Sequence, residues 1–299
     1  MMTRAAARRR PCRAVPSQLF VGIAELAGVI ALAGGCSFGR LWEPSREQVL
    51  ERILPSAVQV VLEQQEGRRF RSSSGIAIGA RGTGRDTECF IVTAGHTVSG
   101  AGATKEIYVL FDRHRGGGTK VSASVIAHRD APKLDVAVLR TRSDRCAPAR
   151  PAAAPLLGEA VWVVAFPWGR QMTLGTGIVS QLAADGDKDT ASRLMVDALV
   201  AYGSSGGGVF EARTGRLLGV VEGYNTARVT AQGAGPSWFI DVPMPGQTFV
   251  TPVSDIQRFL AEIGHADLFS GEAPRAETEP DAPGTGSAAA PGRAALARP

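Results

Sequence analysis

Short apolar runs rich in Val and Ile, recurring roughly every ten to twenty residues, constrain the fold of this chain most strongly. Runs of this kind, bounded by Gly, Pro or Asp, are typical of β-strands. The 36 Gly and the low share of aromatic residues, 6%, suit a β protein rich in turns. The runs cover residues 56–62, 75–79, 89–94, 106–111, 121–127, 134–139, 160–166, 173–180, 194–200, 207–210, 217–222 and 248–252. We therefore expect an all-β protein with about a dozen strands.

Helical patterns occur only at the two ends of this β region. Ser45-Arg-Glu-Gln48 matches a capping box, in which the first and fourth residues satisfy each other's backbone N–H groups. The apolar residues that follow share one helix face: Val49, Leu50, Ile53 and Leu54. Ser254 can likewise cap a helix whose inward face carries Ile256, Phe259, Leu260 and Ile263. A short N-terminal helix and a C-terminal helix are expected.

A His, an Asp and a Ser each stand beside an apolar run, and they occur in that order along the chain. These are His96 after Ile91-Val-Thr-Ala-Gly, Asp135 before Val-Ala-Val-Leu139, and Ser205 in a run of small residues. A serine hydroxyl attacks at neutral pH only when an imidazole accepts its proton, and a carboxylate orients that imidazole. Each residue alone can be merely structural, but together the three predict catalysis by a nucleophilic serine.

Over residues 45–263 the chain resembles the protease domain of the HtrA/Deg branch of the trypsin-like serine proteases. Beyond the three sites, the resemblance rests on Ile53–Val60, Ser73–Ile78, Gly175–Ser180 and Phe249–Val253. The family's fold implies two six-stranded antiparallel β-barrels of the chymotrypsin/trypsin type, with the active site between them. His96 and Asp135 are then expected from the first barrel and Ser205 from the second.

The same resemblance assigns roles by motif position. It implies that His96 is the base, Asp135 its orienting partner and Ser205 the nucleophile. The backbone N–H groups of Gly203 and Ser205 are expected to form the oxyanion hole, the pair of donors that stabilises the negative oxygen of the tetrahedral intermediate. The sequence departs from the family at Ser204, where Asn is usual, at Gly208, where Pro or Ala is common, and at Gly95, where Asn or Ala is usual.

The resemblance also places a substrate pocket. Leu199, six residues before Ser205, matches the base of the pocket for the residue that precedes the cleaved bond. Glu222 and Tyr224 fall on the strand that pairs with the substrate backbone, and the Glu222 carboxylate either excludes acidic peptides or points to water. Because no Asp occupies the position of Leu199, we expect cleavage after small or medium aliphatic residues such as Val, Ala or Leu.

The N-terminal residues have the pattern of an export signal. A basic segment, with Arg at positions 4, 8, 9, 10 and 13, precedes an apolar segment from Leu19 to Gly35 that ends in small residues. Leu32-Ala-Gly-Gly-Cys36 resembles a bacterial lipoprotein cleavage site with its Leu one place early. We expect a lipid on Cys36 and a periplasmic or membrane-anchored location facing the cell envelope. Secretion or a retained anchor is the alternative.

Charge and cysteine usage exclude other classes of function. Residues 1–35 carry five Arg and one Glu, so the net charge of +5 leaves +1 for the rest of the chain, and no basic stripe with aromatic residues indicates nucleic acid. Cys89 and Cys146 either form a disulfide around His96 and Asp135 or remain two buried thiols. No zinc-ligand spacing occurs, and neither a metal nor a cofactor is expected.

The expected domain order is a signal peptide at 1–35, a linker at 36–44, the protease domain at 45–265 and a disordered tail at 266–299. The tail is rich in Ala, Pro and Gly, and is too short for the peptide-binding PDZ domain that HtrA/Deg proteases usually carry there. We expect an endopeptidase that acts on unfolded or damaged envelope proteins. Homo-oligomers are common in the resembled family, but the sequence leaves the choice between an oligomer and a monomer open. A catalytically suppressed chaperone or scaffold that binds exposed peptide strands is the alternative.

Overall fold

The computed structural model describes residues 43–64, 67–99, 105–131, 134–182, 194–231 and 238–269. The expected signal peptide, Cys36 and residues 270–299 of the expected tail lie outside these ranges. Among the helices of the described ranges, none combines the length and the apolar character needed to cross a bilayer.

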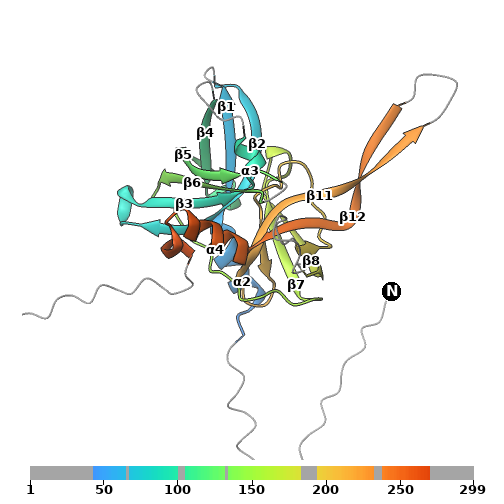
Figure 1. Cartoon of the computed structure of the whole chain (residues 1–299). Coiled ribbons are helices and arrows are strands. Elements are labelled where there is room, and N and C mark those ends of the chain that lie inside the picture. Colours follow the sequence, from blue (N-terminus) through green and yellow to red (C-terminus); the bar gives the residue numbers. More distant parts are fainter. Residues whose placement is uncertain are drawn as a thin grey trace, which may run out of the picture. The chain divides into compact units, whose positions relative to one another are not determined.

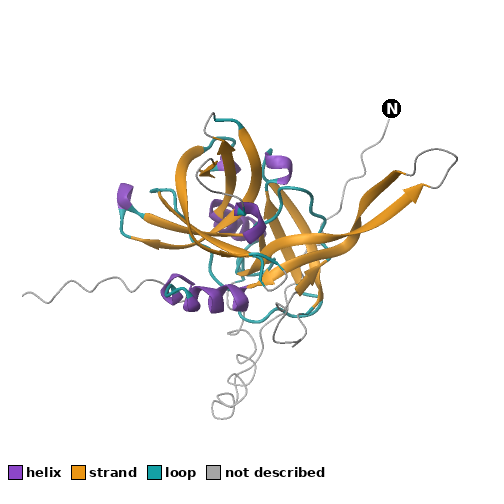
Figure 2. Ribbon diagram, turned by 45° about the horizontal axis from the view of Figure 1, so that its top comes forward, coloured by secondary structure: helices purple, strands orange, loops and turns teal. Residues whose placement is uncertain are grey.

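Two closed antiparallel barrels of six strands each dominate the structure (Figure 1, Figure 2). The first has the strand order β1-β2-β3-β6-β5-β4, and the second has the order β10-β11-β12-β9-β8-β7. The first comprises β1 (Ala57–Gln64), β2 (Arg69–Arg81), β3 (Glu88–Thr93), β4 (Lys105–Phe111), β5 (Thr119–Arg129) and β6 (Val136–Arg142). The second comprises β7 (Ala160–Ala165), β8 (Thr173–Gln181), β9 (Leu194–Val196), β10 (Gly208–Glu211), β11 (Leu217–Ala231) and β12 (Trp238–Pro252). The two-barrel prediction is confirmed, and each predicted apolar run overlaps one strand.

Helical segments are short and lie between or after the strands. The α-helices are α2 (Arg46–Ile53), α3 (Gly95–Val98) and α4 (Val253–Glu262). Single turns of 3-10 helix are η1 (Leu54–Ser56), η2 (Gly84–Asp86), η3 (Arg113–Arg115), η4 (Pro167–Gly169) and η5 (Ala266–Phe269). The purple segments of Figure 2 show how little of the described chain is helical.

Apolar side chains fill each barrel and also join the two. On β1, Val58, Val60 and Leu62 face the interior of the first barrel, while Ala57 belongs to the cluster that joins the barrels. This joining cluster contains Ile76 and Phe90 of the first barrel with Val164, Phe166 and Phe210 of the second. Full burial of one such side chain contributes about 1.5–3 kcal/mol, so apolar burial fixes how the barrels meet.

The two terminal helices agree with the sequence to different degrees. The capping box at Ser45 is present: its side chain accepts a hydrogen bond from the Gln48 backbone, and the Gln48 side chain accepts one from the Ser45 N–H. The expected cap at Ser254 is wrong, because α4 begins at Val253 after Pro252 and has no side-chain cap. Ser254 therefore lies inside the first turn, where its side chain cannot act as the N-cap.

The folded part continues past the boundary predicted at residue 265. Leu268 and Phe269 in η5 are buried in the cluster that joins the barrels. A Cβ placed on Gly79 of β2 would lie 2.8 Å from the Leu268 carbonyl oxygen, so η5 lies directly against that strand. Residues 266–269 thus belong to the domain, because their two large apolar side chains complete its core.

Strands β11 and β12 extend far beyond the runs predicted for them and form a two-stranded hairpin that projects from the second barrel (Figure 1). Val229 pairs with Ile240 on one face of this hairpin, and Arg228 pairs with Asp241 on the other. The Arg228 Nε atom lies 2.9 Å from Asp241 Oδ1. This ion pair lowers the pKa of Asp241 below its ordinary value and raises that of Arg228. The mixture of polar and apolar residues here gave no continuous apolar run to detect.

Candidate active site

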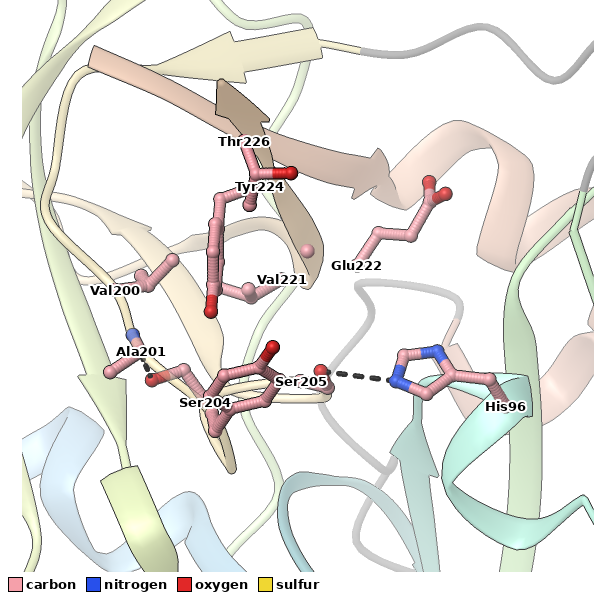
Figure 3. Close-up of a pocket in the computed structure, with 11 residues that line it drawn as sticks. His96, Val200, Ala201, Ser204, Ser205, Val221, Glu222, Tyr224 and Thr226 are labelled. Carbon is pink, nitrogen blue, oxygen red and sulfur yellow. Dashed lines mark hydrogen bonds between the residues drawn. The ribbon is translucent and has the colours of Figure 1, made fainter. Parts of the chain in front are cut away.

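His96, Asp135 and Ser205 come from different turns of the two barrels and meet at their junction. His96 lies in α3, directly after β3, and Asp135 directly precedes β6 of the same barrel. Ser205 lies in the turn before β10 of the second barrel. Figure 3 shows the imidazole of His96 directed at the Ser205 hydroxyl across this junction.

The three side chains form a continuous hydrogen-bonded chain. His96 Nδ1 lies 2.5 Å from Asp135 Oδ2, and His96 Nε2 lies 3.2 Å from Ser205 Oγ. Asp135 Oδ1 also accepts a hydrogen bond of 2.8 Å from the His96 backbone N–H. Because the buried carboxylate accepts from Nδ1–H, it leaves Nε2 as the ring acceptor for the serine proton. This arrangement can take a proton from Ser205 and return it.

Two of the unusual glycines are explained by close packing around this chain. A Cβ on Gly95 would lie 1.9 Å from the Arg129 carbonyl oxygen, so the segment that carries His96 can approach β5 only with glycine there. A Cβ on Gly208 would lie 2.4 Å from the ring of Phe210 and 2.7 Å from the side chain of Ile76. At both positions, neighbouring atoms occupy the space that the Cβ of any other residue would need.

The turn that carries the serine also requires glycine. Gly203 and Gly206 have φ angles of +90° and +82°, which side-chain-bearing residues rarely adopt. Ser204 is buried, and its Oγ accepts a hydrogen bond of 3.2 Å from the Ala201 N–H. Of the two adjacent serines, only Ser205 has its hydroxyl beside His96.

The peptide groups proposed for the oxyanion hole are held in place from behind. The Tyr202 carbonyl accepts a hydrogen bond of 2.6 Å from the Trp168 N–H, and the Ser204 carbonyl accepts one of 2.8 Å from the Gly207 N–H. In a trans peptide the N–H points opposite to the C=O, so these bonds fix the directions of the next N–H groups, those of Gly203 and Ser205. Within the described ranges, neither N–H donates a hydrogen bond.

A pocket of about 260 Å³ opens beside Ser205. Its wall includes the side chains of Val200, Val221 and Tyr224, and Figure 3 shows the Glu222 carboxylate on the His96 side. Burial raises the pKa of Tyr224 above its ordinary value, and the neighbouring Tyr202 adds to this shift, so the phenol is neutral at physiological pH. The full lining is His96, Val200, Ala201, Tyr202, Ser204, Ser205, Val221, Glu222, Gly223, Tyr224 and Thr226.

The prediction that Leu199 forms the base of this pocket is wrong. Leu199 is 80% exposed and does not line the pocket, whereas Val200 does. The segment is extended and its burial alternates: Ala198 and Val200 are buried, and Asp197 and Leu199 are exposed. Alternate residues of an extended chain face opposite sides. The polar Asp197, two residues earlier, was the signal that could have placed Leu199 outside.

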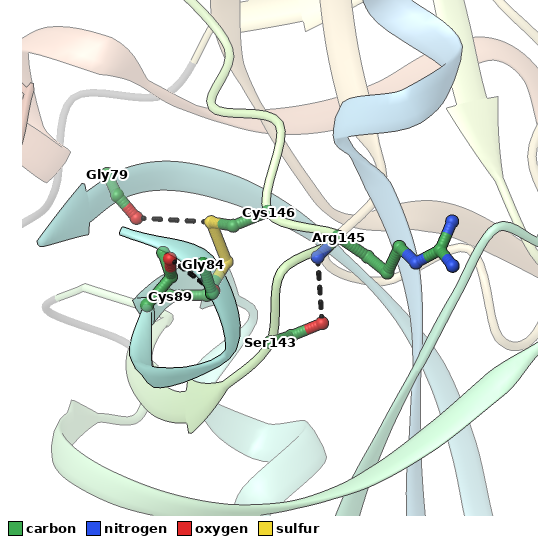
Figure 4. The surroundings of a disulfide bond; sticks show 7 residues. Gly79, Gly84, Cys89, Ser143, Arg145 and Cys146 are labelled. Carbon is green, nitrogen blue, oxygen red and sulfur yellow. Dashed lines mark hydrogen bonds between the residues drawn. A yellow bond between two sulfur atoms is a disulfide. The ribbon is translucent and has the colours of Figure 1, made fainter. Parts of the chain in front are cut away.

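Cys89 and Cys146 are joined by a disulfide (Figure 4). Cys89 lies in β3, just before the segment that carries His96, and Cys146 follows β6, the strand that Asp135 precedes. The bond closes a chain segment with a sequence separation of 57 residues that contains both His96 and Asp135. It therefore fixes the two segments that supply the base and its carboxylate. Among the described side chains, no group of three or more His, Cys, Asp or Glu residues could hold a metal ion.

Comparisons with known proteins agree with this fold and site. Residues 73–220 match the family model of the trypsin-like peptidase domain. Serine protease HTRA3 of Rattus norvegicus is 29% identical over 230 residues, which are 72% of this chain and 43% of the relative. Serine protease HTRA1B of Danio rerio is 30% identical over 224 residues, 72% of this chain and 40% of the relative. This chain thus spans less than half the length of these relatives.

Solved structures show the same fold. The serine endoprotease from Yersinia pestis superposes with a TM-score of 0.54 at 19% identity, covering 74% of this chain and 66% of that one. The HtrA-type protease AlgW with a tripeptide has a TM-score of 0.54 at 18% identity, covering 74% of this chain and 65% of that one. With the family match and the curated relatives, these structures lead to one assignment. The chain belongs to the trypsin-like peptidases and is related to the HtrA serine proteases.

Proposed function

We propose that this protein is a serine endopeptidase in which Ser205, His96 and Asp135 act together. The observation that carries the proposal is the hydrogen-bonded chain from the buried Asp135 carboxylate through the imidazole to the Ser205 hydroxyl. Nearby lie a pocket open to a substrate side chain and two N–H groups without hydrogen-bond partners among the described residues. Membership of the trypsin-like peptidases supports the same conclusion.

The reaction begins when Ser205 Oγ attacks the carbonyl carbon of the peptide bond. His96 Nε2 accepts the hydroxyl proton, and Asp135 stabilises the imidazolium that forms. The carbonyl oxygen becomes negative and receives hydrogen bonds from the N–H groups of Gly203 and Ser205. Each such donor contributes about 3–4 kcal/mol to lowering the barrier. The C–N bond then breaks, and the proton passes from His96 to the leaving amine.

An acyl group now remains on Ser205 and is removed by water. His96 takes a proton from the water, the resulting hydroxide oxygen attacks the ester carbonyl, and the proton returns to Ser205 Oγ as the acid leaves. The pocket holds the side chain that precedes the cleaved bond. Because Val200 and Val221 in its wall are apolar, we propose cleavage after small or medium aliphatic residues.

We further propose that the protein works outside the cytoplasm on unfolded polypeptides of the cell envelope. The disulfide between Cys89 and Cys146 supports this location, because disulfides persist in oxidising compartments. Lipid attachment at Cys36 remains a prediction from the sequence. We expect mass spectrometry to detect a lipid on the wild-type chain and none on a Cys36→Ser form expressed with its own N-terminus.

The function is tested by hydrolysis of an unfolded protein such as reduced, alkylated casein. We expect the wild-type protein to release peptides, and the Ser205→Ala variant to release none while keeping the same thermal unfolding curve. Ser204→Ala is the matched control, because it removes the adjacent hydroxyl, which does not contact His96. Activity that survives in Ser205→Ala, or is lost only in Ser204→Ala, contradicts the proposal.

A further inference from the structure

The turn that carries Ser205 lies between strand β11 and strand β2. The Gly206 N–H donates a hydrogen bond of 2.7 Å to the Val221 carbonyl of β11. On the other side, a Cβ on Gly206 would lie 2.2 Å from the Ser74 carbonyl oxygen of β2. The pocket lies on the β11 side. When the pocket holds the side chain before the cleaved bond, the part of the peptide after that bond therefore extends over β2.

Arginine side chains gather on this β2 side. Arg71 of β2 donates to the carbonyl oxygen of His96 itself and lies 3.4 Å from that of Thr97. Arg69, two residues earlier on the same strand, donates to the Gly169 carbonyl of η4 over 3.3 Å. The guanidinium groups thus reach the two segments, α3 and η4, that contact the turn carrying Ser205.

Two further arginines extend this basic surface along η4. Arg170 follows η4 directly and is exposed. Its carbonyl oxygen accepts a hydrogen bond of 3.1 Å from Arg113 of η3, which also donates to the Gly117 carbonyl over 3.2 Å. We call Arg69, Arg71, Arg113 and Arg170 the exit arginines. Three of the four are held by neutral backbone carbonyls.

No carboxylate of the described residues lies within ion-pair distance of an exit arginine. Nearby acidic groups pair elsewhere: Glu63 contacts Lys120 at 2.6 Å, and Asp112 contacts Arg145 at 3.6 Å. A carbonyl acceptor leaves the positive charge uncompensated. It also leaves most of the five guanidinium N–H donors available. Arginines already held in place lose less conformational freedom when they bind a carboxylate.

We propose that the exit arginines select polypeptides with acidic residues shortly after the cleaved bond. This inference rests on the proposed endopeptidase function and adds the chemistry of its substrate on the leaving-group side. Carboxylates of the substrate take the positions that no carboxylate of the protein occupies. Exposed ion pairs are each weak, so two of them change the ratio of rates by about 3- to 10-fold.

The test uses three fluorogenic peptides with the same acyl part, ending in Val at the cleaved bond. The second and third residues after that bond are Glu-Glu, Gln-Gln or Lys-Lys. We expect kcat/KM to fall in that order, with about 3- to 10-fold between Glu-Glu and Gln-Gln at low ionic strength. The difference should shrink in 0.5 M salt, because exposed charges are screened.

The variant Arg69→Gln/Arg170→Gln removes two of the four exit arginines, so the ratio of kcat/KM between the Glu-Glu and Gln-Gln peptides should fall towards one. Its charge-matched control is Arg140→Gln/Arg142→Gln, at the end of β6 far from Asp135, which should keep the preference. Equal rates for the Glu-Glu and Gln-Gln peptides in the wild-type protein overturn the inference. So does a preference of undiminished size in the Arg69→Gln/Arg170→Gln variant.

Binding separates this inference from the proposed function. In the Ser205→Ala variant, which cannot form an acyl group, the Glu-Glu peptide should bind about 3- to 10-fold more tightly than the Gln-Gln peptide. Tighter binding without cleavage by the wild-type protein contradicts only the endopeptidase function. Cleavage without any difference in rate or binding contradicts only the role of the exit arginines.

Discussion

Replacing Gly203 with Ala tests how the nucleophile turn is held. Gly203 has a φ of +90°, and an added Cβ would lie 2.8 Å from the Phe166 carbonyl oxygen and 2.9 Å from the Trp168 nitrogen. The φ angle alone costs an Ala about 1 kcal/mol. A methyl group forced into filled space adds about 1–3 kcal/mol. We therefore expect the free energy of unfolding to fall by about 2–4 kcal/mol.

Activity should fall further than stability alone explains. The new methyl group meets the Trp168 N–H that fixes the Tyr202 carbonyl, so the peptide that supplies the Gly203 N–H must move. Losing one oxyanion donor costs about 10²- to 10³-fold in kcat. Urea unfolding gives the stability, and a fluorogenic peptide gives kcat and KM separately.

Gly158→Ala is the matched control, because Gly158 has a φ of +80° and nothing within 4 Å of an added Cβ. It should lose only about 1 kcal/mol of stability and keep its kcat. The reasoning is refuted if Gly203→Ala matches Gly158→Ala in both measurements. Equal kcat would mean that the Tyr202–Gly203 peptide does not contribute to catalysis.

Three further predictions follow from the contacts. Asp135→Asn should lower kcat by about 10⁴-fold in a protein with unchanged circular dichroism, because Asn no longer fixes the imidazole; a loss under tenfold contradicts this role. Reducing the Cys89–Cys146 disulfide should lower the free energy of unfolding by up to about 4 kcal/mol, given the separation of 57 residues. Two free thiols in non-reducing mass spectrometry contradict it. Burial raises the pKa of Asp255, which is 2% exposed, above its unfolded value, so stability is lost as pH rises through the folded pKa. Asp255→Asn should therefore raise the melting temperature at pH 7 but not at about pH 3, and an equal rise at both contradicts this.

Several barrel strands, such as β1 and β3, could be predicted from the sequence because they are buried on both faces. In β1, seven of the eight residues are buried and five of the eight are apolar, which gives an apolar run that can be recognised in the sequence. The hairpin of β11 and β12 could not be predicted in the same way. Its strands carry mixed residues such as the Arg228–Asp241 pair, so no continuous apolar run marks them.

Some residues of the site could be predicted from the sequence and others could not. Residues that need a particular chemistry, such as His96 and Ser205, stand in recognisable local sequences. Residues that only shape the pocket have no such local signature. Val200 lines the pocket and Leu199 does not, because neighbouring side chains of this segment point to opposite sides. The Trp168 N–H that holds the nucleophile turn is a backbone group, so no side-chain pattern marks it.

Covalent labelling with a fluorophosphonate probe tests the central claim most directly, because the probe reacts with a serine activated by a neighbouring base. Peptide mapping by mass spectrometry should locate one adduct on Ser205, and His96→Ala should abolish it without unfolding the protein. A folded wild-type protein that forms no adduct, or forms it on Ser204, contradicts the account.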